Sequence, residues 1–358
     1  MSQVRIGLVC PYSLTIPGGV QGQVLVLARS LRALGHETRV LGPCDGPPPD
    51  AGVTPLGKSI PTAANGSVAP LAPDPSAQLR LIRALRDEAF DVLHLHEPLA
   101  PGATMTACVV RSAPLVGTFH AAGRSAAYRW GRPGVRYLAR RLDLRCTFSE
   151  DARALAQRAL GGEYEMVWNG IEVDRFAKAD AWPTDGPTVL FCGRHEPRKG
   201  LAVLLGAMAH LPSDVRLWVA GDGPETGALQ ARFGGEPRIE WLGRISDEEK
   251  QSRLRGADVF CAPSLGGESF GVVLLEGMAA GTPVVASDLP GYANVARAGL
   301  DALLVPPGDA AALAGAIETV LGEPTTAERL VASGEERAAG FAMDRLAERY
   351  LELYDRVA

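Results

Sequence analysis

Short apolar runs alternate with longer segments of helical apolar spacing along most of the chain. This alternation predicts strands and helices in turn, which is typical of an α/β fold. The predicted strands are residues 4–9, 38–41, 91–95, 114–119, 146–149, 188–192, 216–220, 238–242, 257–263, 284–286 and 301–305. The predicted helices are residues 20–34, 76–90, 150–160, 201–211, 247–255, 270–280, 309–322, 325–337 and 345–357.

The segment 173–187 interrupts this alternation. It is rich in Asp, Pro and Thr and is predicted to link two domains. A length of 358 residues also suits two domains better than one. The six cysteines have no CxxC spacing, so we expect reduced core residues rather than a metal site.

The stretch 261–288, CAPSLGGESFGVVLLEGMAAGTPVVASD, predicts a strand, a glycine turn, a helix and a second strand. A helix N-terminus behind a glycine turn is an anion site, because its free N–H groups and its dipole face the ligand. Glu268 and Glu276 are eight residues apart, about 80° around a helix axis. The two carboxylates could therefore both hold sugar or ribose hydroxyls. The alternative is that Glu268 only caps the helix and Glu276 is only a solvated acid.

Two other glycine turns follow predicted strands. Gly18 and Gly19 lie at the first crossover of a βαβ unit, without the GxGxxG pattern of dinucleotide binding. Arg194 and Lys199 lie in the turn after strand 188–192. The planar guanidinium of Arg194, with its fork of N–H donors, and the compact ammonium of Lys199 would both suit a pyrophosphate. Either cation could instead be a surface charge.

Two motif matches are rejected as sites. Residues 52–59, GVTPLGKS, fit the P-loop letters, but no hydrophobic strand precedes them and no helix follows, so we expect a chance match in a surface segment. His94 and His96 alternate at one strand end without a third ligand nearby in sequence. His120 ends the next strand, at the edge of the sheet where ligands bind in open α/β folds.

The motif GGESFGVVLLEGMAAGTPVVASD resembles the E-x7-E region of glycosyltransferase family 4, and the resemblance runs nearly end to end. Within that family the chain is most similar to the actinobacterial phosphatidylinositol mannosyltransferases. The resemblance implies a GT-B fold, which is two Rossmann-like domains facing a central cleft. Residues 1–173 would form the acceptor- and membrane-facing domain, residues 187–340 the nucleotide-sugar domain, and residues 341–358 a helix that crosses back to the first domain.

The resemblance also implies roles for individual residues. Glu268 would position the sugar, Glu276 the ribose, and His120 would lie over the anomeric carbon. The implied donor-binding residues are Gly19, Arg194, Lys199, Glu268, Ser269, Phe270, Gly271 and Glu276. The implied acceptor-binding residues are Tyr12, Gln21, Asn65 and Ser67.

The implied reaction is retaining transfer of a hexose, best matched by mannose from GDP-mannose, to phosphatidylinositol or a related acceptor. The resemblance requires no metal or other cofactor and leaves room for Mg²⁺ without indicating it. A UDP-sugar donor and a soluble acceptor such as inositol phosphate remain open within the family. Outside it, a nonhydrolysing sugar-nucleotide epimerase, a P-loop NTPase and a non-catalytic lipid-binding module are the competing classes.

The net charge of −5 is unevenly distributed, at +4 over residues 1–175 and −9 over the remainder. A basic N-terminal half suggests a localised anionic partner. The arginines and interleaved aromatic residues of segment 123–145 predict contact with an anionic membrane; a solvated helix face is the alternative, and no nucleic-acid motif accompanies them. For segment 76–90 a membrane contact is implied by the resemblance. The predicted membrane residues are Arg80, Arg83, Arg129, Arg132 and Arg136. The family's lysine-rich cluster is absent from 76–90. Without a signal-peptide pattern or a transmembrane stretch, we expect a cytoplasmic protein peripheral to the inner face of the plasma membrane.

Overall fold

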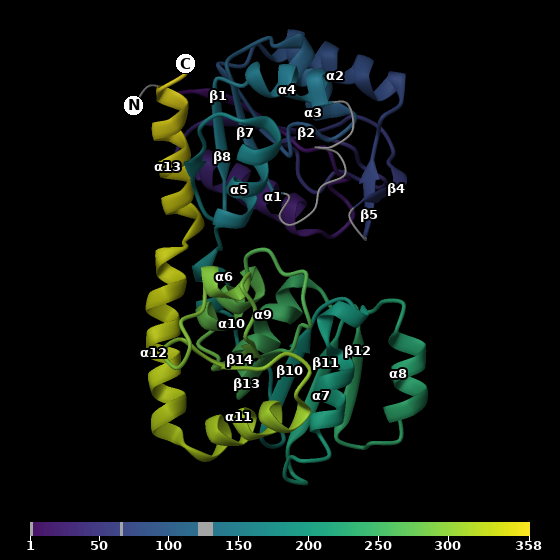
Figure 1. Ribbon diagram of the computed structural model, residues 1–358, viewed down its shortest axis with the longest axis vertical. Coiled ribbons are helices and arrows are strands. Elements are labelled where there is room, and N and C mark those ends of the chain that lie inside the picture. The colour runs from purple at the N-terminus through teal and green to yellow at the C-terminus, as the bar shows by residue number, and fades with distance from the viewer. Residues whose placement is uncertain (1–2, 65–66, 121–131) are drawn as a thin grey trace. The chain divides into compact units, whose positions relative to one another are not determined.

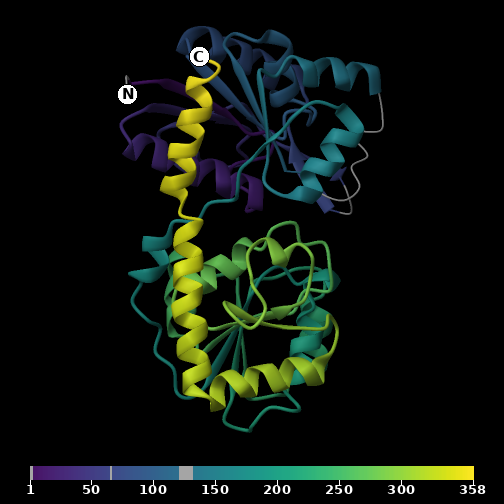
Figure 2. The same cartoon turned by 60° about the vertical axis from the view of Figure 1, so that its left-hand side comes forward.

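The computed structural model describes residues 3–64, 67–120 and 132–358; the side chains of residues 63, 64, 67, 68 and 132 are not described. The chain divides into two compact units (Figures 1 and 2). Unit 1 comprises Met1–Gly170 and Met343–Ala358, and unit 2 comprises Ile171–Ala342. Each unit is a parallel sheet with helices on both faces, as the alternating pattern predicts.

The parallel sheet of unit 1 has the strand order β3-β2-β1-β6-β7-β8-β9. Its strands are β1 (Arg5–Val9), β2 (Glu37–Gly42), β3 (Val53–Pro55), β6 (Val92–His96), β7 (Leu115–Phe119), β8 (Leu144–Thr147) and β9 (Glu165–Met166). A separate antiparallel hairpin joins β4 (Ile60–Ala64) to β5 (Ser67–Leu71). The central strands are buried on both faces and read as continuous apolar runs.

Helices cover both faces of this sheet because alternate strand residues point to opposite sides. Helices α1 and α13 share one core with Ile6 and Leu8, and helices α2 to α5 share the other with Val9 (Figure 2). The helices are α1 (Gly19–Ala33), α2 (Pro75–Glu88), α3 (Ala103–Val110), α4 (Arg132–Arg140), α5 (Glu150–Leu160) and α13 (Met343–Asp355). The last helix of the chain therefore completes the first unit.

The sheet of unit 2 repeats the plan, with the order β12-β11-β10-β13-β14-β15. Its strands are β10 (Thr188–Cys192), β11 (Arg216–Ala220), β12 (Ile239–Gly243), β13 (Val259–Ala262), β14 (Val284–Ser287) and β15 (Ala302–Val305). Its helices are α6 (Val173–Ala177), α7 (Leu201–Ala207), α8 (Thr226–Phe233), α9 (Asp247–Gly256), α10 (Val272–Ala279), α11 (Ala310–Gly322) and α12 (Pro324–Gly340), with 3₁₀ turns at Pro197–Lys199 and Tyr292–Asn294. Helix α10 comes close to the sheet at Gly277, where a Cβ would lie 2.9 Å from Phe260.

In both sheets the chain order of the strands reverses once. The reversal lies between β1 and β6 in unit 1 and between β10 and β13 in unit 2. Open α/β sheets bind ligands outside the carboxyl ends of the strands at such a point. We therefore expect ligand-binding residues directly after these four strands.

The segment 173–187 is not a free linker. It begins with α6, which packs against α9 and α10 within unit 2. Trp182 then docks on α9, where its backbone N–H donates to Ser252 O at 2.9 Å and the Arg253 guanidinium lies 4.3 Å from the centre of its ring. The polar composition of 173–187 predicted a linker between domains, whereas the structure holds this segment on unit 2 through the buried Phe176 and through Trp182.

Two other local expectations are also wrong. The P-loop-like segment is not a surface loop, because Val53 and Leu56 are buried and β3 extends the sheet; the strand β4 follows it, so the rejected nucleotide loop has no helix. The apolar spacing of α2 places Leu79, Ile82, Leu85 and Ala89 on one side of the helix; Leu85 is buried, but Leu79 is 67% exposed and Leu81 is buried instead. The buried residues of α2 are Ala77, Leu81 and Leu85, and Leu81 packs in the core with Leu56.

Candidate functional site

The carboxylate of Glu268 is the centre of a polar cluster in unit 2. Its Oε1 accepts from Lys199 Nζ at 2.7 Å and from Ser264 Oγ at 3.0 Å, while Arg198 Nη1 lies 3.4 Å away. The Glu268 and Lys199 side chains are only 11% and 17% exposed. The cluster therefore holds a shielded ammonium group whose present partner is a carboxylate, an oxyanion that a phosphate can replace.

Glycines at two positive-φ positions bring this cluster together. Gly200 has φ +68°, and a Cβ there would lie 1.9 Å from Pro263 O, so the turn that carries Lys199 lies directly against the end of β13. Gly271 has φ +99° and precedes α10. Such backbone conformations are accessible to glycine at little cost and strained for other residues.

A second ion pair joins helices α9 and α10. Lys250 Nζ donates to Glu276 Oε1 at 2.9 Å, and the same ammonium lies 5.7 Å from the centre of the Phe176 ring. Burial alone would lower the pKa of Lys250, but the charge of Glu276 and its hydrogen bond outweigh burial and raise the pKa. Lys250 therefore stays charged, and the carboxylate of Glu276 is compensated inside an apolar helix.

The end of β10 connects the two ion pairs. Burial raises the pKa of the Cys192 thiol to about 11; the charges of Lys250 and Lys199 oppose this rise and that of Glu276 adds to it. Both pairs are thus within electrostatic reach of one strand end. That end is the one expected to carry a ligand from the strand order.

The other predicted donor residues are more dispersed. Arg194 is 60% exposed on its side chain and pairs with Glu196 at 3.1 Å. Ser269 is exposed, whereas Phe270 is buried edge-to-face against Phe341, with ring centres 5.7 Å apart. In unit 1, Gly19 begins α1, and a Cβ there would meet no described atom within 4 Å.

His120 follows β7 in unit 1 and is held by two neighbours. Its backbone N–H donates to Glu97 Oε2 at 2.9 Å, and its Nε2 lies 3.1 Å from His96 Nδ1. Burial lowers the pKa of His120 to about 4, so the ring is neutral at pH 7. Glu97 has φ +51°, a left-handed conformation that a non-glycine residue adopts only where its surroundings hold it.

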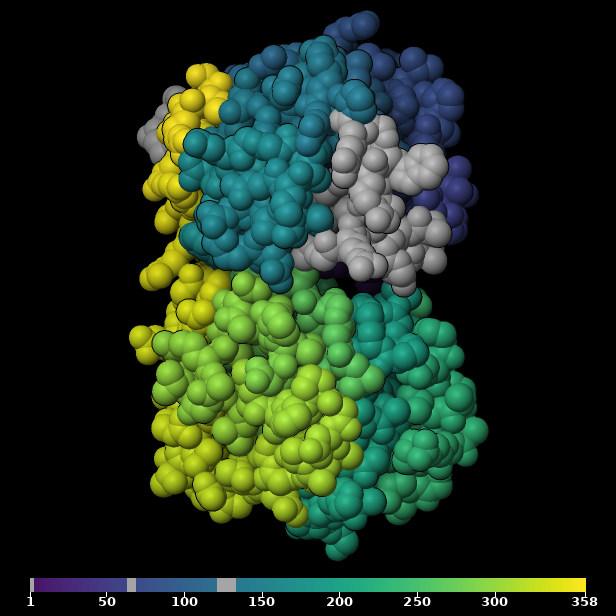
Figure 3. All heavy atoms as spheres, in the orientation of Figure 1, coloured from purple at the N-terminus to yellow at the C-terminus, as the bar shows by residue number. Residues whose placement is uncertain are grey.

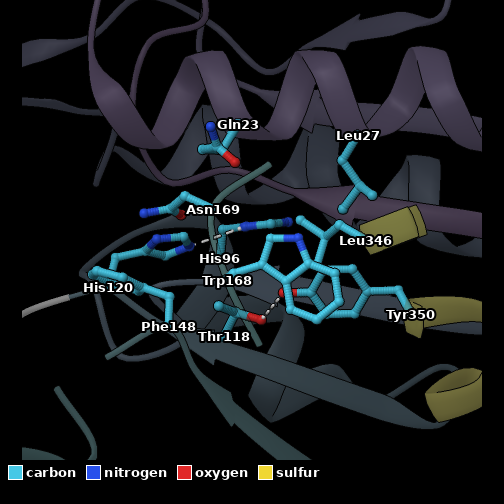
Figure 4. Close-up of a pocket in the computed structure, with 10 residues that line it drawn as sticks. All are labelled: Gln23, Leu27, His96, Thr118, His120, Phe148, Trp168, Asn169, Leu346 and Tyr350. Atoms are coloured by element: carbon cyan, nitrogen blue, oxygen red, sulfur yellow. Dashed lines mark hydrogen bonds between the residues drawn. The ribbon is translucent and has the colours of Figure 1, made fainter. Parts of the chain in front are cut away.

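A small cavity lies beside His120 (Figure 4). Residues of α1, β6, β7 and α13 and of the three loops after β7, β8 and β9 line it. They are Gln23, Leu27, His96, Thr118, His120, Phe148, Trp168, Asn169, Leu346 and Tyr350. Its volume of about 10 Å³ is close to what one water molecule needs.

The predicted acceptor residues have different surroundings. Tyr12 forms an isolated bridge with Leu71, and burial together with the charge of Glu97 raises its pKa. Gln21 is buried and donates to Ile16 O at 3.2 Å, so it braces the loop before α1. Asn65 lies outside the described residues, and Ser67 is placed in β5 without a described side chain.

The predicted membrane arginines make partly structural contacts. Arg80 donates to Leu56 O at 2.6 Å, and Arg136 donates to Ala159 O at 3.0 Å. The Arg83 side chain is 84% exposed. Arg129 lies outside the described residues, and Arg132 begins α4 without a described side chain.

Sequence reasoning missed three polar residues of these sites. Glu97 follows β6 at the reversal point, so its position after a strand could have indicated it. Lys250 belongs to a charged helix whose letters do not distinguish it from its solvated neighbours. Tyr292 OH lies 2.9 Å from Ser264 Oγ and supports the Glu268 cluster, but only the fold brings it there.

The described residues contain neither a metal-ligand group nor a membrane-spanning helix. Over residues 3–64, 67–120 and 132–358, the structure gathers no group of three metal-ligating side chains. Across the same ranges, no helix has the length and apolar character to span a bilayer.

Comparison with known proteins identifies the class. The model for "Glycosyltransferase Family 4" matches residues 17–175, and that for "Glycosyl transferases group 1" matches residues 186–323. The chain is 43% identical to the phosphatidyl-myo-inositol mannosyltransferase of Mycobacterium leprae and 41% to that of Mycobacterium tuberculosis H37Rv; each alignment covers 99% of this chain and 97% of the relative.

Solved structures match the fold. Sucrose-phosphate synthase from Thermosynechococcus elongatus superposes with a TM-score of 0.75 at 22% identity, covering 99% of both chains. Anabaena HepE in complex with UDP and glucose gives 0.76 at 19% identity, covering 99% of this chain and 100% of that one.

Two Rossmann-like units with polar clusters at their strand ends define a GT-B glycosyltransferase. The chain belongs to glycosyltransferase family 4, as the motif around Glu268 predicted.

Proposed function

We propose that the protein transfers mannose from GDP-mannose to phosphatidylinositol. The observation that carries this choice of substrates is the 40–43% identity, over 99% of the chain, to mycobacterial proteins named phosphatidyl-myo-inositol mannosyltransferase. The residues of unit 2 would supply the chemistry that a nucleoside-diphosphate sugar needs. The acceptor would use the strand ends of unit 1.

In this proposal the diphosphate replaces Glu268 as the partner of Lys199. The pair at 2.7 Å brings together the cation that a leaving diphosphate needs and a carboxylate that can accept from sugar hydroxyls. Arg194 is exposed on the same loop and would add a second cation. Charge-assisted contacts of this kind stabilise the negative charge that grows on the leaving group.

Glu276 would accept from the ribose hydroxyls. Its Oε1 is bonded to Lys250, and a carboxylate has acceptor positions left after one such bond. Lys250 would balance the charge of the Glu276 carboxylate when the nucleotide excludes water. The backbone around Ser269, Phe270 and Gly271, which leads into α10, would contribute N–H donors to the phosphates.

We propose same-face transfer with retention of configuration. The bond from C1 to the phosphate oxygen breaks, the bond from C1 to the acceptor oxygen forms, and the acceptor proton passes to the departing phosphate. Neutral His120 would act as a hydrogen-bonding group beside the sugar, because its pKa of about 4 makes a charged acid unavailable at pH 7. Trapping of a glycosyl–enzyme adduct would contradict this mechanism.

The reaction would take place at the cytoplasmic face of the membrane. Helix α3 packs between α2 and α4, and the surface they share carries exposed apolar groups among arginines. The exposed apolar residues there are Leu79, Val109, Val110 and Tyr137. In Figure 3 the blue to teal residues of α2 to α5 form the outer surface of unit 1 on the side shown. Apolar groups within a basic surface suit an anionic bilayer.

The test is an assay of the purified protein with GDP-mannose and vesicles of phosphatidylinositol in phosphatidylcholine. Mass spectrometry of the lipid should show one added hexose. Lys199→Ala should abolish the product, whereas Lys178→Ala, at an exposed lysine of the same unit, should not. A product formed only from a UDP-sugar, or only on inositol phosphate, would overturn the substrate assignment, and an epimerised free nucleotide sugar would overturn the class of reaction.

A further inference from the structure

A buried hydrogen-bond network lies behind His120 and belongs to no role assigned above. His94 is fully buried; its Nδ1 lies 2.7 Å from Tyr354 Oη and its Nε2 lies 2.7 Å from Thr118 Oγ1. Thr118 Oγ1 also lies 3.0 Å from Tyr350 Oη. Helix α13, which carries both tyrosines, is thereby tied to strands β6 and β7.

His96 connects this network to His120. It follows His94 on the same face of β6, with ring centres 4.2 Å apart, and its Nδ1 lies 3.1 Å from His120 Nε2. Figure 4 shows this contact and the one between Thr118 and Tyr350. Because His94 is held at both ring nitrogens, its packing against His96 limits rotation of the His96 ring.

The other nitrogen of His96 has an unmet hydrogen-bonding requirement. Nε2 is buried without a partner among the described residues, and so is Nε1 of Trp168. Both residues line the cavity, His96 is 2% exposed, and Figure 4 shows both rings at the cavity. Buried polar atoms of this kind are usually satisfied by water or a ligand.

The chemistry of the two nitrogens restricts what the cavity can hold. An indole N–H can only donate, so the occupant must present an acceptor oxygen to Trp168. If the same oxygen accepts from His96 Nε2–H, then His96 Nδ1 carries no proton and must accept from His120 Nε2–H. The Nδ1 of His120 is then left as an acceptor.

We propose that His96 is a positioning residue that fixes His120 as its Nε2–H tautomer, with a single oxygen atom of water or of a substrate hydroxyl in the cavity as the third member. In this state His120 would offer Nδ1 to a hydroxyl of the sugar or of the acceptor. The tautomer matters because the ring stays neutral at pH 7 and so has one donor and one acceptor. The catalytic consequence rests on the function proposed above, but the tautomer itself does not.

Three substitutions separate the two nitrogens of His96. Asn places an amide oxygen near the position of Nδ1, Gln places its amide near Nε2, and Leu removes both groups. We expect His96→Asn to retain kcat within about threefold. His96→Gln and His96→Leu should lower kcat on the order of 10- to 100-fold, the usual range for a lost orienting partner. The KM for the donor should change little in all three variants. His36→Asn is the matched control. His36 is buried in the same unit, but it accepts from Val4 N–H at the amino ends of β1 and β2, whereas His96 lies at the carboxyl end of β6.

Histidine ¹⁵N NMR of the substrate-free protein tests the proposal without any assay of transfer. The His120 signals, assigned with His120→Gln, should show protonated Nε2 in the wild type and in His96→Asn, and a mixture of tautomers in His96→Gln and His96→Leu. Protonated Nδ1 in the wild type, or the same tautomer in all variants, would overturn the proposal. If the tautomers behave as expected but no mannose is transferred, the proposed function fails and the inference about His96 stands.

Discussion

Glu268 and Lys199 form an ion pair at 2.7 Å, so in the proposed donor complex the carboxylate would compete with phosphate for the ammonium group. Glu268→Gln removes that competition and also removes a charged acceptor for sugar hydroxyls. We predict that the variant binds GDP several-fold more tightly than the wild type, as calorimetry would show, while its transfer rate falls by about 100-fold, the loss expected of about 3 kcal/mol.

The control for this prediction is Glu248→Gln, at a largely exposed acid of the same unit, which should alter neither quantity. Weaker GDP binding by Glu268→Gln would contradict the prediction. It would mean that the carboxylate holds Lys199 in position for the diphosphate.

The buried histidines of unit 1 make its stability depend on pH. Burial lowers the pKa of His94 to about 3 and that of His96 well below its usual value. The unfolded chain, with histidine pKa near 6.5, binds more protons than the folded chain between pH 6.5 and about 3. Stability is therefore retained above pH 6.5 and lost as the pH falls.

Urea unfolding at constant ionic strength should show a loss of about 1 kcal/mol for each such histidine between pH 7 and pH 5.5. The His94→Gln variant should lose about one histidine's share of this dependence. His210→Gln, at an exposed site, should retain all of it. Equal stability of the wild type at the two pH values would contradict the prediction, because it would show that the folded and unfolded chains take up the same number of protons between them.

Single residues also show where sequence reasoning succeeds. Glu268 and Lys199 are 69 positions apart, yet both could be predicted because each lies in a turn after a recognisable strand. Lys250 could not, because its role depends on the packing of α9 against α10. Residues at strand ends carry positional information in the sequence, and residues in the middle of polar helices do not.

At the scale of elements, the start of α10 depends on the backbone of Gly271. Its φ of +99° is strained for residues with a Cβ, and a Cβ there would lie 3.0 Å from Tyr292 Cδ1. We predict that Gly271→Ala lowers the free energy of unfolding by about 1–2 kcal/mol and weakens GDP binding, because the turn that precedes α10 must shift.

Gly315→Ala is the matched control, since Gly315 lies exposed within α11 with space for a methyl group among the described residues. It should stabilise unit 2 by about 0.5–1 kcal/mol and leave binding unchanged. Calorimetry and urea unfolding measure both effects. Wild-type affinity in Gly271→Ala would show that the donor does not contact this turn.

The elements themselves were largely predictable, and their faces less so. The boundaries of α5, β10 and β11 agree with the apolar pattern to the residue. In α2 the pattern grouped Leu79 with Leu85, but the structure buries Leu85 together with Leu81 and exposes Leu79. Periodicity gives the type of element, whereas the buried face depends on the neighbours that the fold supplies.

At the scale of the whole chain, the same strand order occurs twice, and each reversal point carries a polar cluster. Alternation of strands and helices predicted this plan, since few arrangements place helices on both faces of a parallel sheet. It did not predict that 173–187 packs on unit 2, because the buried residues of that segment are few and separated.

The uneven charge of the chain leads to a prediction about membranes. With +4 over residues 1–175 and −9 over the rest, binding to anionic vesicles should depend on unit 1 alone. We predict that the protein co-sediments with vesicles containing phosphatidylinositol and not with pure phosphatidylcholine, and that 0.5 M NaCl releases it, because surface charges are screened at that ionic strength.

Arg83→Glu together with Arg86→Glu, on the exposed side of α2, should reduce binding at least several-fold, at about 1 kcal/mol per basic residue near the surface. Arg216→Glu, which reverses one charge on unit 2, should have no effect. Salt-resistant binding, or equal loss in the control variant, would contradict an electrostatic membrane contact through α2.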